Sequence, residues 1–139
     1  MSLFDSTNVA STALNAQTIR LNTIASNMAN ANTVSSSSDE TYVARAPRFE
    51  AVLENQIDAN DTSQLGVKVD EIIEVGGEAR KEFSPNHPMA DEDGYIYKPD
   101  IDPAIELANM MQASRAFQNS VEAINTAKQL ALRTLTLGK

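Results

Sequence analysis

The 139-residue sequence has no cysteine, no tryptophan and a single histidine. The absence of cysteine excludes disulfides, thiolate metal sites and cysteine nucleophiles. No run of eighteen apolar residues occurs, so the sequence contains no candidate for a membrane-spanning helix. Basic residues are also scarce, with 11 Lys and Arg against 19 Asp and Glu. A net charge of −8 without a basic block argues against nucleic-acid binding, because such binding depends on neutralising phosphates.

The charge is distributed unevenly along the chain. Residues 1–33 carry one acid and one base, residues 34–103 carry sixteen acids and six bases, and residues 104–139 carry two acids and four bases. The net charges of these three parts are therefore 0, −10 and +2. We expect residues 1–33 and 103–139 to form one helical domain, with residues 34–102 as a β-rich insertion.

The N-terminal part has the pattern of a long helix. From position 7 to position 31 it contains no Gly or Pro, and Leu14, Leu21 and Met28 recur every seven residues. The positions at alternating steps of three and four are Thr7, Ala10, Leu14, Gln17, Leu21, Ile24, Met28 and Ala31. Most other positions are small and uncharged, which allows other helices to approach closely. The N-terminus lacks the basic region and apolar stretch of a cleaved secretory signal.

The C-terminal part predicts a second helix, from Pro103 to Leu137. Asp102 is a favourable N-cap, Pro103 suits the first helical position, and Gly138 is a typical stop. The three-and-four spacing continues through Leu107, Met110, Ser114, Phe117, Val121, Ile124, Lys128, Ala131 and Leu135. This helix would be about 50 Å long, whereas a compact globule of this chain length is about 35–40 Å across. The two helices therefore pair, project beyond the rest of the chain and need further partners.

The middle of the chain predicts short strands. Residues 42–49 are extended but irregular because of Pro47, and residues 50–57 fit either a short helix or a loop. Residues 66–75 alternate and are rich in β-branched side chains, and Gly76-Gly77 predicts a turn into a returning strand at residues 79–83. A loop at residues 84–94 precedes a last extended stretch at residues 95–97. The expected fold class is α+β: two long paired terminal helices in a coiled-coil-like arrangement, with a small β-rich insertion between them.

One cluster near the middle resembles a metal site. His87 lies close to Asp91, Glu92 and Asp93, and Gly94 could stand at the sixth position of a calcium loop. The first position would then be Met89, which is no ligand, and one histidine without cysteine is too little for zinc. A solvated turn explains these residues better. No nucleophile motif or glycine-rich phosphate loop is present, so we expect no enzyme activity, no metal and no cofactor.

Several motifs resemble those of the flagellar rod and hook family. They are the stretches LNAQTIRLN at 14–22, IASNMANANT at 24–33, GVKV at 66–69, NHPMADEDGY at 86–95, ASRAFQN at 113–119 and NTAK at 125–128. The resemblance covers nearly the whole chain. The chain departs from the family pattern at Asp100-Ile-Asp102, where asparagine is more usual at the first position, and in the Ser35–Ser38 tract of a variable loop.

The resemblance implies a structural subunit of the proximal rod in the bacterial flagellar basal body. It also implies passage through the flagellar type III export apparatus without signal cleavage, polymerisation in the periplasm and transmission of motor torque to the hook and filament. The implied partners are copies of the chain itself, FliE, and the rod proteins FlgB, FlgF and FlgG. We predict that the subunit interface uses these seam residues: Leu14, Leu21, Ile24, Met28, Leu107, Met110, Phe117, Val121, Ile124 and Leu135.

Two alternatives make different predictions. A coiled-coil adaptor that does not polymerise would be a folded dimer in solution with both helices fully ordered. A small metal-dependent enzyme would be centred on His87, Asp91 and Asp93 and would hold stoichiometric metal.

Overall fold

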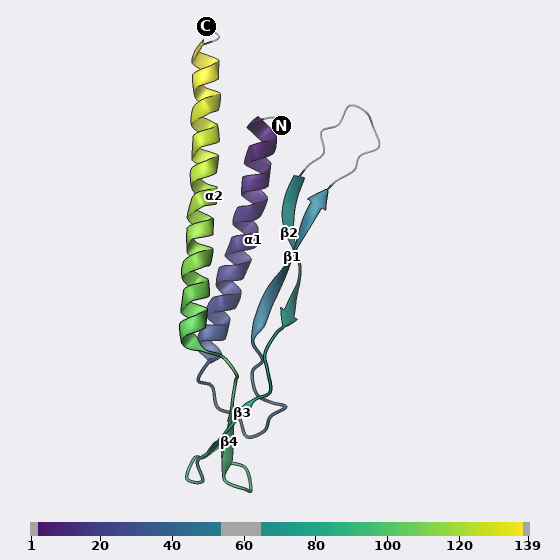
Figure 1. Cartoon of the computed structure of the whole chain (residues 1–139), viewed down its shortest axis with the longest axis vertical. Coiled ribbons are helices and arrows are strands. Elements are labelled where there is room, and N and C mark those ends of the chain that lie inside the picture. The colour runs from purple at the N-terminus through teal and green to yellow at the C-terminus, as the bar shows by residue number, and fades with distance from the viewer. Residues whose placement is uncertain (1–2, 54–64, 138–139) are drawn as a thin grey trace.

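The computed structural model describes residues 3–53 and 65–137. The elements, in chain order, are α1 (Leu3–Asn30), β1 (Arg45–Leu53), β2 (Leu65–Glu74), β3 (Arg80–Phe83), β4 (Tyr95–Lys98) and α2 (Pro103–Leu137). The molecule is elongated, with the two helices side by side and both chain ends at the same end of the molecule (Figure 1). The expected α+β class, with two long terminal helices and β structure between them, is confirmed.

The two helices begin close to where the sequence predicts. In α2, the backbone N–H of Ala104 donates to Oδ1 of Asp102 at 2.8 Å, so Asp102 is the N-cap. α2 is 35 residues long, as expected. α1 begins before position 7 and ends one residue before Ala31. Gly138, the expected stop of α2, lies outside the described residues.

α1 and α2 are antiparallel and unequal in length. Nη2 of Arg20 donates to Oε1 of Gln112 at 3.3 Å. These two residues therefore lie at about the same height along the helix pair. Moving 17 residues back along α1 to Leu3 corresponds to moving 17 residues forward along α2, to position 129. α2 then continues for 137 − 129 = 8 residues, about 12 Å, past the start of α1. We call residues 130–137 the overhang, which is visible beyond the N-terminus in Figure 1.

α1 is the middle layer of the molecule. It contacts α2 on one side and both strands of the β1–β2 hairpin on another, and within the described residues α2 contacts neither strand. The hairpin is antiparallel, with a bulge between Arg48 and Phe49 just after Pro47, as the irregular strand expected here suggests. Because α1 is covered on two sides, it carries little charge. The hairpin of the same chain covers a side of α1 where the sequence suggested that further helices would pack.

The predicted pairing of residues 66–75 with residues 79–83 is wrong. β2 pairs instead with β1, and β3 pairs with β4. Gly76 does not make a hairpin turn; it lies so close to the strand entering β1 that an added Cβ would come within 2.9 Å of Val43 Cγ1. Of the residues expected to fit either helix or loop, 50–53 belong to β1 and 54–57 lie outside the described residues.

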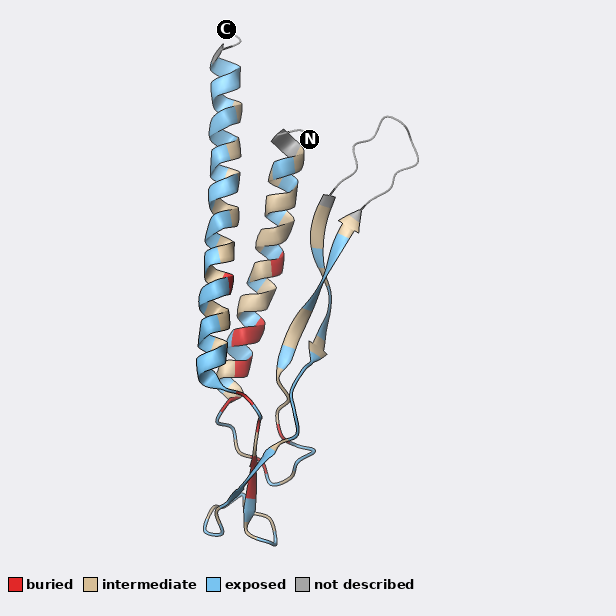
Figure 2. Ribbon diagram, in the orientation of Figure 1, coloured by how far each residue is buried: buried red, intermediate tan, exposed pale blue. Residues whose placement is uncertain are grey.

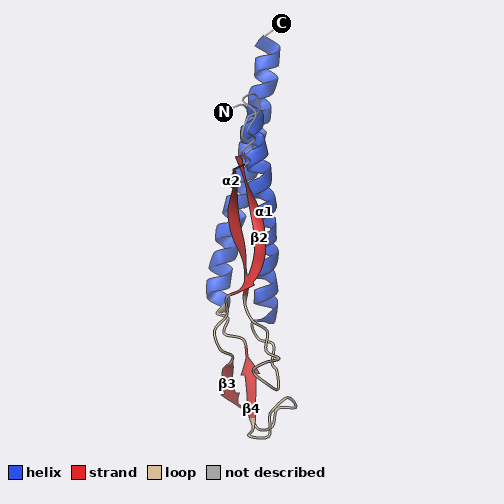
Figure 3. Ribbon diagram, turned by 90° about the vertical axis from the view of Figure 1, so that its right-hand side faces the viewer, coloured by secondary structure: helices blue, strands red, loops and turns tan. Residues whose placement is uncertain are grey.

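β3 and β4 form a separate small sheet below the helices, as Figures 1 and 3 show. Ser35 and Tyr97 exchange backbone hydrogen bonds of 2.9 and 3.0 Å, which tie the loop after α1 to β4. Ile96, Pro99 and Ile101 are buried there. These contacts place β4 directly beneath the start of α2.

The buried core is thin. Figure 2 shows buried residues in the lower half of α1, at one position of α2 and around β4. The buried apolar residues are Ala16, Ile24, Ala31, Ile96, Tyr97, Ile101 and Ala113, together with Pro99. Among the described residues no helix is long and apolar enough to cross a membrane. Much of the apolar surface of the two helices therefore stays accessible in the isolated subunit.

Candidate assembly interface

The predicted seam of α1 lies on the side of that helix nearest to α2. Ala10 lines a groove together with Asn119, Ser120 and Ala123 of α2. Leu14, Leu21 and Met28 follow Ala10 at helical spacing and are half-buried, and Ile24 is buried. This burial is what a helix contact along the seam of α1 would produce.

The predicted seam of α2 is only partly covered. Met110, Phe117, Val121 and Ile124 are half-buried, as expected for a helix contact. Leu107 is 48% exposed and Leu135 is 70% exposed. Leu107 is exposed because a seven-residue repeat drifts by about 20° per repeat around a straight helix, so the early seam positions lie off the contact. Leu135 is exposed because it lies in the overhang, beyond the start of α1.

The sequence pattern missed the centre of the contact, which is Ala113. Its side chain is completely buried, and no other described residue of α2 falls in the buried class. An alanine among polar residues gives little hydrophobic signal, although it allows two helices to approach closely. Its burial shows that α2 is tightly packed at this level, beside the hydrogen bond between Arg20 and Gln112.

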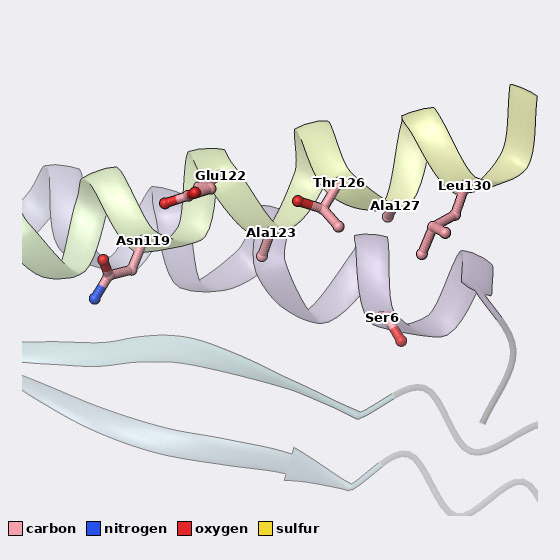
Figure 4. A pocket seen from close by; sticks show the side chains of 7 residues that line it. All are labelled: Ser6, Asn119, Glu122, Ala123, Thr126, Ala127 and Leu130. Atoms are coloured by element: carbon pink, nitrogen blue, oxygen red, sulfur yellow. The ribbon is translucent and has the colours of Figure 1, made fainter.

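An open groove runs between the helices where they separate towards the chain ends. It consists of two adjoining hollows of about 560 and 500 Å³, which share Ser6, Asn119 and Ala123. The other lining residues are mostly small: Val9, Ala10, Ala13, Ser120, Thr126 and Ala127. Figure 4 shows Ala123, Ala127 and Leu130 along the edge of α2 that borders α1. The groove offers no cluster of catalytic groups, but its small side chains leave room for another helix.

Asn27 joins the hairpin to α1. Its Nδ2 donates to the carbonyl of Arg45 at 2.9 Å, and its Oδ1 accepts from the backbone N–H of Arg45 at 3.0 Å. The hydroxyl of Tyr42 donates to the same oxygen at 3.0 Å, and Asn27 is only 2% exposed. The side-chain amide of Asn27 therefore hydrogen-bonds both backbone groups of Arg45, as the backbone of a neighbouring strand would. Sequence reasoning missed this residue, because it is one of five asparagines in α1 and no local pattern distinguishes it from the others.

The hairpin presents a charged outer face to solvent. Arg48 binds Asp70 at 2.6 Å and Glu71 at 3.0 Å, and Lys68 binds Glu50 at 3.0 Å. The hydrogen bond from Arg48 lowers the pKa of Asp70, and the same bond raises the pKa of Arg48. Because all these side chains are exposed, each pair contributes little to stability. Their effect is to keep this side of the molecule hydrated.

The acidic turn is built around Asp91. Its Oδ1 accepts from the backbone N–H groups of Asp93 at 3.0 Å and Tyr95 at 2.7 Å, and its Oδ2 accepts from the hydroxyl of Tyr97 at 3.1 Å. These bonds, the one from Tyr95 N–H foremost, lower the pKa of Asp91. Gly94 has a φ of +82°, which the turn requires.

His87 is part of the same loop but does not join Asp91 in a site. Its Nδ1 accepts from the backbone N–H of Met89 at 3.1 Å. Within the described part of the chain, no three His, Cys, Asp or Glu side chains converge as metal ligands would. The carboxylate of Asp91 is engaged by its own turn, which is a structural role.

Comparison with known proteins agrees with this geometry. Residues 8–34 match the family model "Flagella basal body rod protein", and residues 92–137 match "Flagellar basal body rod FlgEFG protein C-terminal". The flagellar basal-body rod protein FlgC of Yersinia enterocolitica is 41% identical over 140 residues, with both chains covered in full. The chain belongs to the FlgC family. FlgC of Salmonella typhimurium is 39% identical and FlgC of Bacillus subtilis 28% identical, again over the full length of both chains.

Membership of the FlgC family establishes the general function. The protein is a structural subunit of the bacterial flagellar basal-body rod and not an enzyme. The two family models cover residues 8–30 of α1 with the first four residues after it, and β4 with α2. The matched segments are therefore the helix pair and the strand beneath it, where the exposed seam and the open groove lie.

Proposed function

We propose that this member of the FlgC family polymerises through its terminal helices, and that the seam residues of both helices form the subunit interface. The observation that carries the proposal is a long helix pair whose apolar stripe is only partly covered within one chain. Leu107 is exposed on α2, and a groove with small side chains stays open between the helices. Packing against helices of neighbouring subunits would bury both, so assembly would stabilise the helices by mass action.

The partners in this proposal are other copies of the chain, FliE, and the rod proteins FlgB, FlgF and FlgG. The helical domain of residues 1–33 and 103–139 would form the inner wall of the rod, with the β-rich residues 34–102 outside it. The charged outer face of the hairpin supports this orientation, because it is suited to water. The assembled rod would transmit motor torque across the periplasm to the hook and filament.

We also propose that the chain reaches the periplasm through the flagellar type III export apparatus without cleavage of a signal peptide. Such a chain passes the apparatus unfolded. The absence of cysteine suits this route, since a disulfide would obstruct threading.

The interface is tested by Leu107→Asp in a flagellated bacterium that has lost its own gene for this subunit. Because Leu107 is already exposed, the free energy of unfolding of the purified subunit should change by no more than about 0.5 kcal/mol. Swimming should nevertheless be lost, because a carboxylate would enter a dry contact between subunits. Gln129→Asp adds the same charge at an exposed position of α2 outside the seam and should preserve swimming. Normal swimming of Leu107→Asp at wild-type subunit levels would refute the proposed interface.

A coiled-coil adaptor remains distinguishable by its solution state. It would be a stable dimer when dilute, whereas a rod subunit is expected to be monomeric. Sedimentation of the purified chain separates the two.

A further inference from the structure

The β1–β2 hairpin is attached to α1 by two polar side chains. Asn27 binds both backbone groups of Arg45, at the start of β1. Towards the other end of the hairpin, Oγ1 of Thr12 accepts from the backbone N–H of Val67 on β2 at 3.2 Å. Gly66 allows this approach, because a Cβ added there would lie 3.3 Å from the same oxygen. Each strand is therefore held by one side chain of α1, and we call Thr12 and Asn27 the two anchors.

The anchors are spaced alike on the helix and on the hairpin. Thr12 and Asn27 are 27 − 12 = 15 residues apart on α1, which is about 22 Å. Val67 pairs with Ala51, which is 51 − 45 = 6 residues from Arg45 along β1, or about 20 Å. Because the two lengths agree, the anchors fix the direction of the hairpin, which runs along α1 in Figure 1.

The face of α1 that carries the anchors is covered between them. Ala16, Thr23 and Asn27 are buried, and Thr12 is half-buried. These four positions follow one another at steps of four, seven and four residues, so they form one stripe along the helix, which we call the buried stripe. The hydroxyl of Thr23 is also paired, since it donates to the carbonyl of Ile19 at 2.9 Å. The buried stripe therefore needs no further partner, in contrast to the exposed seam positions of α2.

The segments that lead into and out of the hairpin are held in place. Before β1, the buried Thr41 donates from its hydroxyl to the carbonyl of Ser37 at 2.8 Å, and Ser35 is tied to β4. After β2, the backbone N–H of Val75 donates to the carbonyl of Ala44 at 2.8 Å. Exchange of the hairpin between two copies needs connecting segments that can swing out, and these contacts oppose such a movement.

We propose that the hairpin stays docked on α1 of its own chain in the assembled rod, so that neighbouring subunits contact the helix pair only outside the buried stripe. Thr12 is a positioning residue, because it keeps the hairpin in line with the helix pair. The proposal rests on the function proposed above and narrows the surface that assembly can use. Neighbours approach from α2 and from the groove between the helices.

The absence of cysteine makes a disulfide between helix and hairpin a direct test. A Cβ at position 66 would lie 3.7 Å from Cβ of Thr12, and disulfides usually span about 3.8 Å between these atoms. Thr12→Cys with Gly66→Cys is placed in a flagellated bacterium that has lost its own gene for this subunit. In isolated basal bodies we expect a disulfide within single chains, and we expect normal swimming.

Thr12→Cys with Asp70→Cys is the matched control. Asp70 is exposed and lies four residues further along β2, about 13 Å away, which is too far for a disulfide. The pair at positions 12 and 66 should give at least about tenfold more disulfide than this control.

Three results would overturn the proposal. Disulfides between two chains would show that hairpins are exchanged between subunits. A pair that oxidises in the purified chain but stays reduced in basal bodies would show that the hairpin leaves α1 on assembly. Swimming that returns only after addition of a reductant would show that the hairpin must be free.

Thr12→Val tests the anchor without a cross-link. The substitution keeps the shape of the side chain but removes the acceptor for the Val67 N–H, so amide exchange around Val67 in the purified chain should be about tenfold faster. Thr12→Ser keeps the hydroxyl and should restore the wild-type rate. Equal rates in the two variants would show that Thr12 has no positioning role.

Leu107→Asp distinguishes this proposal from the helix interface. Loss of swimming in Leu107→Asp together with disulfides between chains would refute the docked hairpin and leave the helix interface intact. Normal swimming of Leu107→Asp together with a disulfide within single chains would do the reverse.

Discussion

At the scale of single residues, Asp91 illustrates how a charged side chain can be structural. Three donors, two from the backbone and one from the Tyr97 hydroxyl, surround its carboxylate at 2.7 to 3.1 Å. These bonds favour the ionised form, so the pKa of Asp91 in the folded chain is below its ordinary value of 3.8. Its contribution to stability is therefore complete above that value and is lost as the pH falls through the lower folded pKa.

We expect Asp91→Asn to lower stability at neutral pH and to lose less stability on acidification than the wild type does. The neutral amide keeps an oxygen for the two backbone donors but no longer offers a charged acceptor. Urea unfolding at several pH values between neutrality and acid measures the difference. Asp93→Asn is the control, because Asp93 is exposed and its carboxylate makes no hydrogen bond in the described structure. Parallel stability curves for wild type and Asp91→Asn would contradict this role.

At the scale of helices and strands, Asn27 joins the hairpin to α1. We expect Asn27→Ala to lower the free energy of unfolding by about 1–3 kcal/mol, because the backbone groups of Arg45 would lose their buried partner. The hairpin should be released first, since a two-stranded sheet is marginal without support. Amide exchange along β1 and β2 reports that release, with Asn22→Ala, an exposed asparagine of the same helix, as control. Unchanged exchange of the hairpin would show that its attachment does not depend on Asn27.

Sequence reasoning succeeded where a pattern repeats and failed where a partner was distant. The seven-residue repeat of Leu14, Leu21 and Met28 and the cap at Asp102 are local signals, and both helices follow from them. The signal for a strand at residues 66–75 was also local, but no local signal indicated that this strand pairs with β1. Gly76-Gly77 resembles a turn, whereas Gly76 is needed for a close approach to Val43. Which strand pairs with β2 depends on how the strands pack against α1, and no local sequence pattern records that packing.

The contact between the two helices was predictable to a similar extent. The pattern identified the apolar stripe of α2, and the structure shows Met110, Phe117, Val121 and Ile124 half-buried on it. It could not show that Leu135 lies beyond the start of α1, because that depends on how the helices are aligned. Ala113 was missed because its small side chain allows the helices to approach closely, whereas the pattern identifies only large apolar side chains.

At the scale of the whole molecule, charge and apolar surface are separated in a way that suits a subunit. The helices leave apolar side chains and a groove open, while the hairpin presents paired charges to water. The overhang extends about 12 Å past the start of α1. Isolated helical segments of this length are unstable in water, so we expect it to be frayed until a neighbour covers it.

Hydrogen exchange on the dilute monomer and on the assembled rod tests polymerisation through the terminal helices most directly. Amides of residues 130–137 should exchange almost without protection in the monomer and become strongly protected in the rod. The groove-lining turns around Ala10 and Ala123 should also gain protection, whereas the exposed β3 should change less. Strong protection of residues 130–137 in the dilute monomer, or none in the rod, would contradict assembly through these helices.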